Sequence, residues 1–207
     1  MNELEKWLEL AIEIQSLAQT GLAYTSNVYD VERYERLRDI SSEMIALKSD
    51  LKFDKIKELF CNETGYQTPK IDTRAAIFKD NKILLVHENN GTWSLPGGWC
   101  DVLESIGTNT IKEVKEETGL DVINKKLIAV QDRNKHNKPI YAYGICKTFI
   151  LCEVIGGEFL ENIETTEINY FSLGEIPNNL AEEKNTKEQI EMCFEAYKNK
   201  NWETQFE

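Results

Sequence analysis

The stretch from Gly98 to Leu120 reads GWCDVLESIGTNTIKEVKEETGL, and it decides how the rest of the chain is interpreted. Its glutamates Glu113, Glu116 and Glu117 have the spacing that brings three side chains to one face of a helix. Like charges at this spacing destabilise an isolated helix by roughly 0.2–0.5 kcal/mol per pair. A hard divalent cation would reverse that cost, because Mg²⁺ and Mn²⁺ prefer carboxylate oxygens.

Without their surroundings, the three glutamates are more typical of a solvated helix face. Lys112 and Lys115 alternate with them, and helices of this composition are common on protein surfaces. Asp101 and Glu104 precede the predicted helix and extend the acidic cluster. A family resemblance of the wider segment favours a metal site over a solvated face.

That segment resembles the Nudix box: a glycine, five residues, a glutamate, seven residues, then Arg-Glu-aliphatic-x-Glu-Glu-x-Gly-aliphatic. Every defined position matches except Lys112, which stands where the family has arginine. Lysine keeps the charge but lacks the planar fork of donors, so we expect it to tune activity without abolishing it. The resemblance implies an α/β/α sandwich and Mg²⁺ or Mn²⁺ held by the carbonyl of Gly97 and the carboxylates of Glu113, Glu116 and Glu117.

The first third of the chain is predicted to be helical. Apolar residues recur every three or four positions from Leu4 to Ala18, with Asn2 as a cap and Gly21 as the stop. A second helix is expected from Asp30, and a third over residues 53–61. The breakers between residues 63 and 69 then mark a boundary, so we predict a helical domain over 1–66 and a Nudix domain over 67–207.

After the boundary the pattern changes to an α+β order. We expect strands over residues 71–78 and 82–87 around a turn at Asp80 and Asn81, then the charged helix ending at Gly119. Further strands are expected over 122–131, 141–154 and 168–172, and a helix over 186–198. The fold class is therefore a Nudix sandwich with a mixed sheet behind a small all-helical domain.

The N-terminal third carries a second resemblance. Gln19-Thr20-Gly21-Leu22 and Tyr29-Asp30-x-Glu32-Arg33-Tyr34 are similar to the helical domain of a Nudix subfamily that acts on X-linked nucleoside diphosphates. Its members resemble CDP-choline pyrophosphatases and are often labelled ADP-ribose pyrophosphatases. The resemblance implies a homodimer. The alternative for this motif is a packing and dimerisation module that does not touch the substrate.

Charge and composition limit the classes of molecule that the protein is expected to bind. The formal net charge of −12 is opposite to that of most nucleic-acid-binding proteins, although bound cations could still admit a phosphate substrate. No run approaches the ~18 apolar residues of a membrane span. The acidic start and the five cysteines without a C-x-x-C pair predict a cytoplasmic protein with free thiols.

Candidate bases and substrate contacts lie inside and outside the box. The base that activates water is expected to be a box glutamate, Glu116 or Glu117, or an acid of a later loop, Glu164 or Glu167. Each loop acid could equally be a solvated surface carboxylate, Arg74 a plain ion pair with Asp72, and each aromatic a packing residue. The candidate substrate contacts are Arg74, Trp99, the loop residues Asp132, Arg133 and His136, and the tyrosines Tyr141 and Tyr143.

Three functions follow from these residues. The first is metal-dependent hydrolysis of a small nucleoside diphosphate linked to a group X, giving NMP and phosphorylated X. CDP-choline would give CMP and phosphocholine, and ADP-ribose would give AMP and ribose 5-phosphate; the subfamily resemblance modestly favours the cytidine compound. The alternatives are processing of short RNA ends and a non-catalytic nucleotide sensor, which the intact box glutamates disfavour.

Overall fold

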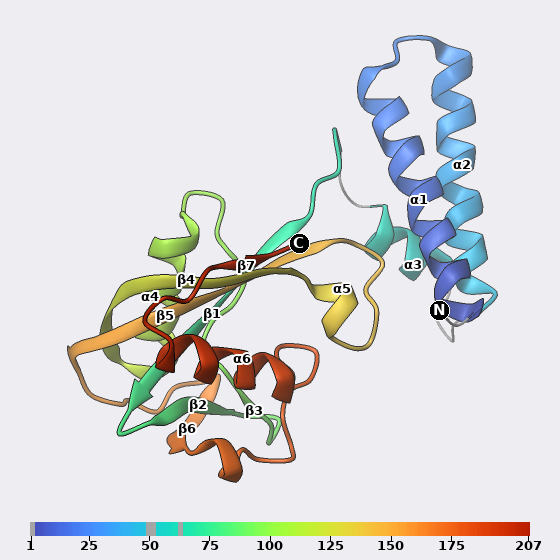
Figure 1. Ribbon diagram of the computed structural model, residues 1–207. Coiled ribbons are helices and arrows are strands. Elements are labelled where there is room, and N and C mark those ends of the chain that lie inside the picture. Colours follow the sequence, from blue (N-terminus) through green and yellow to red (C-terminus); the bar gives the residue numbers. More distant parts are fainter. Residues whose placement is uncertain (1–2, 49–52, 62–63) are drawn as a thin grey trace. The chain divides into compact units, whose positions relative to one another are not determined.

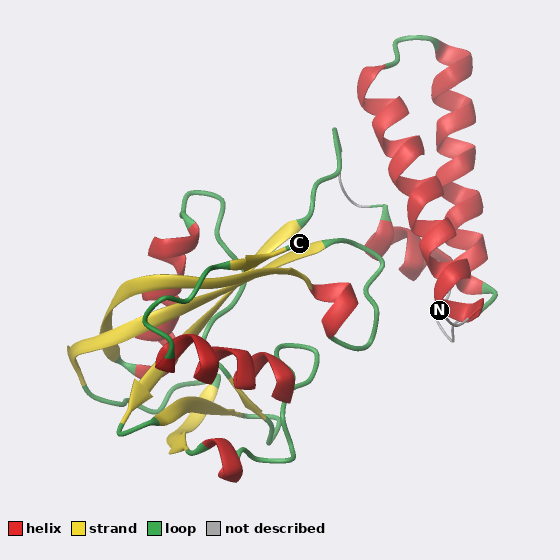
Figure 2. Ribbon diagram, viewed as in Figure 1, coloured by secondary structure: helices red, strands yellow, loops and turns green. Residues whose placement is uncertain are grey.

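The computed structural model describes residues 3–48, 53–61 and 64–207 (Figure 1). The chain divides into two compact units. The first, the helical unit, comprises residues 1–69 with 140–143, and the second, the Nudix unit, comprises residues 70–139 with 144–207. Figure 2 shows helices alone in the N-terminal part and a mixture of helices and strands in the rest, which confirms the α+β class.

The helical unit contains α1 (Glu3–Tyr24), α2 (Val28–Ala46) and α3 (Phe53–Phe60). Figure 1 shows α1 and α2 as an antiparallel hairpin. The second helix begins at Val28, two residues before the predicted start, because the side chain of Asn27 accepts hydrogen bonds from the amides of Tyr29 and Asp30. The predicted cap Asn2 lies outside the described residues.

Gly21 does not end the first helix, so that prediction was wrong. The helix continues to Tyr24, and a Cβ on Gly21 would lie 2.3 Å from Cζ of Tyr34 in α2. The missing side chain therefore makes room for a tyrosine ring between two packed helices. A glycine inside a helical pattern has a packing role here, which sequence alone does not separate from a stop signal.

The Nudix unit is built on a mixed sheet. Its strands follow the order β3-β2-β1-β5-β4-β7, and β6 pairs with β2. β1 is parallel to β5 and β4 to β7, whereas the other pairs are antiparallel. Positive φ at Asp80 (51°) and Asn81 (58°) gives the tight turn expected between the first two strands. The strands are β1 (Lys70–Lys79), β2 (Lys82–Glu88), β3 (Trp93–Ser94), β4 (Leu120–Asp132), β5 (Ile145–Gly157), β6 (Thr165–Phe171) and β7 (Gln205–Phe206).

Helices cover both faces of this sheet. Ala75 and Ile77 of β1 pack with Val114 of α4 (Ile106–Thr118), whereas the intervening Ala76 packs with residues of α6 (Lys187–Lys198). Neighbouring residues of one strand thus face opposite layers, as strand geometry requires. All six residues of β1 from Asp72 to Ile77 are buried for this reason. The three-layer sandwich is confirmed, with the short helices α5 (Arg133–His136) and η1 (Leu173–Glu175) outside its layers.

Two predicted strands are shifted. β5 begins at Ile145, not at Tyr141, because its ladder with β1 starts where Ile145 pairs with Lys70. Tyr141 and Tyr143 precede the strand in the segment that groups with the helical unit. β6 starts earlier than predicted, at Thr165, since it pairs along β2. Among the described residues, no helix combines the length and apolar character that crossing a membrane requires.

Candidate active site

Local sequence fixes the helix that carries the box glutamates. Ser105 caps α4 in a reciprocal pair of hydrogen bonds with Thr108. At the other end Gly119 adopts φ 72°, and a Cβ there would lie 2.2 Å from the carbonyl oxygen of Glu158. The helix therefore ends at the predicted glycine, where both its backbone conformation and the neighbouring chain exclude a side chain.

The glycines before the box form a loop pressed against β1. The amides of Thr73 and Ala75 donate to the carbonyls of Gly98 and Pro96, at 2.9 and 2.8 Å. Gly97 has φ 137°, and a Cβ on it would lie 2.0 Å from the carbonyl oxygen of Thr73. Residues 97 and 98, which we call the glycine loop, can thus approach β1 closely because Gly97 has no side chain.

Two box carboxylates converge on the glycine loop. The amide of Gly97 donates to Oε2 of Glu117 at 2.9 Å. A Cβ on Gly98 would lie 2.6 Å from Oε2 of Glu113, so that carboxylate rests directly on the glycine backbone. Glu116 lies on the same helix but its side chain is 59% exposed. The predicted grouping of glutamates with Gly97 therefore has a structural basis for Glu113 and Glu117.

Burial changes the acidity of these two groups. Burial raises the pKa of Glu117 to about 7, although Arg74 and the amide of Gly97 oppose the shift. Burial also raises the pKa of Glu113, with the Lys112 ammonium opposing it. A desolvated carboxylate is costly to ionise unless a cation lies close by. The site therefore favours cations next to these oxygens.

Lys112, the one departure from the box, lies among these acids. Its Nζ is 2.6 Å from Asp101 Oδ2, 3.6 Å from Glu116 Oε2 and 4.0 Å from Glu113 Oε1. The ammonium thus bridges two box glutamates and an acid from before the helix. Lysine reproduces the charge contacts of a box arginine without its planar geometry.

The donor set suits a hard divalent cation. Carboxylate oxygens of Glu113 and Glu117 meet a backbone loop whose carbonyls are also oxygen donors, which is the chemistry that Mg²⁺ and Mn²⁺ prefer. Within residues 3–48, 53–61 and 64–207, no three His, Cys, Asp or Glu side chains already gather at one point fit for a metal ion. Glu116, long and mainly exposed, is the ligand that would have to turn inward.

A buried charge cluster lies beside the glycine loop. Arg74 is 4% exposed; its Nε donates to Asp72 Oδ1 at 2.9 Å and its Nη1 to the carbonyl of Leu95 at 3.2 Å. The ion pair with Asp72, given as the alternative to phosphate binding, is therefore present. Lys147 of β5 joins the cluster with Nζ 2.9 Å from Asp72 Oδ2. The sequence analysis missed Lys147, and its only signal was a lysine beside the apolar run Phe149–Cys152 of the same strand.

The loop acids lie in different surroundings. Glu167 was predicted to lie in a loop, which was wrong, because it lies within β6, where it is exposed and pairs opposite His87 of β2. Glu164 is also exposed, but it follows Asn162, whose side-chain amide donates to the carbonyls of Glu116 and Glu117, at 3.1 Å in each case. The loop that carries Glu164 is therefore tied to the end of α4. Both acids stay candidates for the base beside the box glutamates.

The predicted loop of Asp132, Arg133 and His136 was wrong in its secondary structure, because Arg133–His136 forms the short helix α5, capped by Asp132. Arg133 is 1% exposed and donates to the carbonyls of Glu183 and Pro139. Nε2 of His136 lies 2.8 Å from Oε1 of Glu207. All three side chains contact the chain itself, so their predicted role in substrate binding stays a prediction.

The predicted aromatic contacts are dispersed. Trp99 is 47% exposed and its backbone bridges to Asp72 at the glycine loop. The rings of Tyr141 and Tyr143 lie 5.6 Å apart in the segment grouped with the helical unit. Trp99 is therefore the predicted aromatic that adjoins the box in the same unit.

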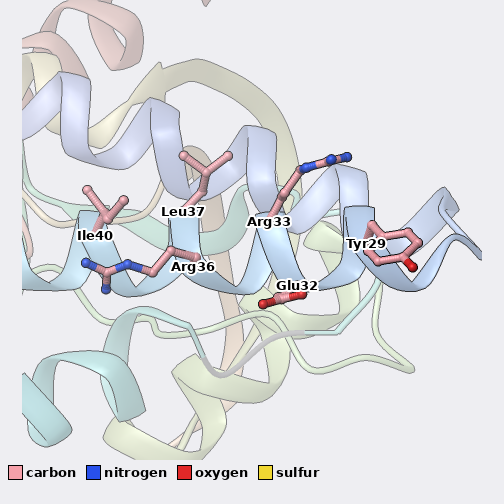
Figure 3. Close-up of a pocket in the computed structure, with 6 residues that line it drawn as sticks. All are labelled: Tyr29, Glu32, Arg33, Arg36, Leu37 and Ile40. Carbon is pink, nitrogen blue, oxygen red and sulfur yellow. The ribbon is translucent and has the colours of Figure 1, made fainter.

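The helical unit has a surface hollow of its own. A pocket of about 600 Å³ lies along α2, and Figure 3 shows its lining side chains in a row on that helix. It contains none of the box residues. Its lining residues are Tyr29, Glu32, Arg33, Arg36, Leu37 and Ile40.

Comparison with family models divides the chain in a similar way. Residues 69–192 match the NUDIX domain. Residues 5–60 match a domain described as UDP-X-like, N-terminal oligomerisation domain. Both the N-terminal and the C-terminal part of the sequence therefore match known domain families.

Individual relatives agree with this assignment. A putative ADP-ribose pyrophosphatase of Bacillus subtilis is 41% identical over 98% of this chain and 97% of its own length. The solved structure of a Streptococcus suis ADP-ribose pyrophosphatase is 53% identical, with a TM-score of 0.63 over 68% of this chain and all of that one. The structure of a UDP-X diphosphatase is 34% identical, with a TM-score of 0.64 over 97% of this chain and 98% of that one. With Glu113 and Glu117 at the glycine loop and both domain models matched, this chain belongs to the Nudix hydrolase family.

Proposed function

We propose that the protein is a divalent-metal-dependent pyrophosphatase that cuts the diphosphate bond of a nucleoside diphosphate linked to a group X. The observation that carries the proposal is the convergence of the Glu113 and Glu117 carboxylates on the glycine loop. Mg²⁺ or Mn²⁺, when bound there, would neutralise the diphosphate and acidify a water molecule. The products would be a nucleoside monophosphate and phosphorylated X.

The residues of the chain supply positions and proton transfer. Gly97, Glu113, Glu116 and Glu117 would hold the cation, with Lys112 keeping two of the carboxylates in place. Glu117 is also a candidate base, because its carboxylate lies at the glycine loop, where the water to be activated would be bound. Glu116, Glu164 and Glu167 are the other candidates. The buried pair Arg74–Asp72 would fix the residue before Pro96 through the carbonyl of Leu95.

For the substrate, we propose ADP-ribose as the first compound to test and CDP-choline as the second. The names of the relatives support ADP-ribose and a UDP-linked compound. The resemblance of the N-terminal motif supports the cytidine compound. RNA ends are disfavoured by the net charge of −12, since the phosphate backbone attracts basic proteins.

The test is a panel assay with chromatography of the products. Wild type, Glu117→Gln and the exposed control Glu195→Gln would receive ADP-ribose, CDP-choline, UDP-glucose, a nucleoside triphosphate and a short 5′-triphosphate RNA. Each would be run with Mg²⁺, with Mn²⁺ and with chelator. Cleavage of an X-linked compound by wild type and Glu195→Gln alone, and only with metal, supports the proposal. Cleavage of RNA alone, or binding of nucleotides without any cleavage, would replace it with one of the two alternatives.

We also propose that the protein is a cytoplasmic homodimer joined through the helical unit. The match of residues 5–60 to an oligomerisation domain supports self-association, and the apolar members of the α2 pocket, Leu37 and Ile40, offer contact area. The five free cysteines support a reducing compartment. Sedimentation of wild type, Leu37→Asp and the control Leu160→Asp would test the dimer. A wild-type monomer, or equal effects of both substitutions, would argue against it.

A further inference from the structure

Residues 181–185, between η1 and α6, form a turn whose backbone carbonyls accept hydrogen bonds from buried side chains. Three consecutive carbonyls, of residues 182, 183 and 184, accept hydrogen bonds from Asn137, Arg133 and Lys147 respectively. Two of the donors belong to α5 and its cap and the third to β5, and all three are at most 1% exposed. Surface carbonyls are ordinarily satisfied by water, so using buried polar side chains here fixes the path of the turn.

The same turn is fixed to the strand that leads into the glycine loop. The amide of Ala181 donates to the carbonyl of Trp93 at 2.9 Å. The amide of Leu95 donates to Oδ1 of the fully buried Asn185 at 2.7 Å. Leu95 is two residues before Gly97, whose amide holds Glu117. Hydrogen bonds therefore connect the 181–185 turn to the segment that leads into the glycine loop.

Lys184 is the cationic side chain of this turn, beside the acids Glu182 and Glu183. Its Nζ lies 2.7 Å from Oε1 of Glu88, which also accepts a hydrogen bond from Ser94 at 2.7 Å. The Glu88 side chain is 12% exposed, whereas that of Lys184 is 34% exposed. The carboxylate is thus enclosed while the ammonium keeps access to solvent. Ser94 directly precedes Leu95, so the Lys184–Glu88 pair is attached to the segment that leads into the glycine loop.

We propose that Lys184 binds the substrate directly, with its ammonium on a non-bridging oxygen of the diphosphate. This inference rests on the proposed function and adds a residue to it from outside the box. In a chain with net charge −12, a protein cation beside the box would add to the attraction that metal ions exert on a diphosphate. Arg74 and Lys147 are 4% and 0% exposed, whereas the side chain of Lys184 is 34% exposed even though it is paired with Glu88. Lys184 has both the exposed head and the fixed backbone that such a contact requires.

The test compares Lys184→Gln and Lys184→Arg with a matched control, Lys125→Gln, which removes the lysine of an exposed ion pair with Glu153. Steady-state kinetics with ADP-ribose and Mg²⁺ should show KM raised roughly 10- to 100-fold in Lys184→Gln, with kcat changed less than about threefold. Lys184→Arg should recover most of the loss because it keeps the charge. Calorimetric titration of ADP with Ca²⁺ should show binding weakened roughly 10-fold by Lys184→Gln alone.

The outcomes separate this inference from the proposed function. KM and ADP affinity within twofold of wild type in Lys184→Gln would overturn it. Equal losses in Lys184→Gln and Lys184→Arg, with a melting temperature lowered in both, would assign Lys184 a structural role instead. If wild type cuts nothing in the panel, the proposed function fails, yet the ADP titration still decides whether Lys184 binds a diphosphate. Failure of wild type to bind ADP, together with no cleavage of any compound in the panel, would overturn both.

Discussion

Helices α2 and α4 both carry several acids interspersed with basic residues, and they use them in opposite ways. On α2, Arg33 pairs with Asp30 and Arg36 with Glu43, both at 2.7 Å and with all four side chains at least 42% exposed. On α4, Glu113 and Glu117 are turned onto the glycine loop and lose much of their hydration. The same residue types thus make a solvated face in one helix and a reactive face in the other.

The difference comes from what packs opposite each helix. The acids of α4 face a backbone loop pressed on β1, which removes water and supplies an amide donor. The acids of α2 pair with arginines along the helix surface, where ion pairs contribute about 0–1 kcal/mol. Function therefore depends on a partner surface that the helix sequence itself does not contain. Substitutions on the two helices can test this contrast directly.

The largest expected effect is that of Glu117→Gln on catalysis. The amide keeps the size of the side chain but cannot take a proton or bind a metal ion as an anion, so kcat should fall about 10²- to 10⁴-fold. The matched change on α2, Glu43→Gln, should leave kcat within about twofold of wild type. Steady-state rates with ADP-ribose and Mg²⁺ measure both. Similar losses in the two variants would contradict the contrast between the helices.

The second largest effect is expected from a substitution in the glycine loop. Gly97→Ala places a Cβ 2.0 Å from a backbone oxygen at φ 137°, so unfolding in urea should show a loss of roughly 3 kcal/mol. Gly91 also has positive φ (86°), but nothing lies within 4 Å of its added Cβ. Gly91→Ala should therefore cost only about 1 kcal/mol. Equal costs would mean that backbone strain alone, and not contact with β1, fixes Gly97.

Lys147 should make the folding stability of the protein depend on pH. Burial lowers the pKa of Lys147 from 10.5 to about 8, with Asp72 opposing the shift. Between about pH 8 and 10.5 the unfolded chain then holds more protons than the folded one, so stability from this residue rises with pH, by on the order of 2 kcal/mol. Lys147→Met should lack that rise. Urea unfolding at pH 7.5, 9 and 10 measures the difference, and parallel curves for both proteins would refute it.

In the helical unit, Gly21→Ala tests packing against propensity. Alanine inside a helix usually stabilises by about 1 kcal/mol relative to glycine. Here the added Cβ would lie 2.3 Å from the Tyr34 ring, so we expect a loss of about 1–2 kcal/mol instead. Gly21→Ala combined with Tyr34→Leu should regain stability. Thermal unfolding of the four proteins of this cycle checks the sign, and stabilisation by Gly21→Ala alone would contradict the packing role.

The smallest effect concerns the residue in which the box departs from its family. Lys112→Arg would add a planar fork between Glu113 and Glu116, and we expect kcat to rise by a factor of about two to five. Its stability should change by less than about 0.5 kcal/mol, because the ion pairs are largely exposed. Lys115→Arg, one turn along the surface, should change neither. A fall in kcat for Lys112→Arg would mean that the lysine is specifically required.

The sequence by itself determined the box and the order of the elements. Glycine, glutamate and cap positions act locally: Ser105 and Gly119 bound the helix, and Asp80 and Asn81 make the turn, wherever the rest of the chain lies. Periodicity predicted the helices and most strands to within a few residues for the same reason. The glutamates of α4 could be named as ligands because their spacing is a property of one helix.

Only the tertiary structure decided which charges are buried and what they touch. Gly21 was wrongly predicted to end a helix, because its packing partner, Tyr34, belongs to another helix and the local sequence does not reveal that contact. Lys147 escaped notice because Asp72, 75 positions away in the chain, is what makes a lysine tolerable inside a sheet. The role proposed for Lys184 depends likewise on donors from two distant segments, α5 with its cap and β5. Long-range contacts of this kind leave no periodic trace in the sequence, since each depends on the packing of the whole unit.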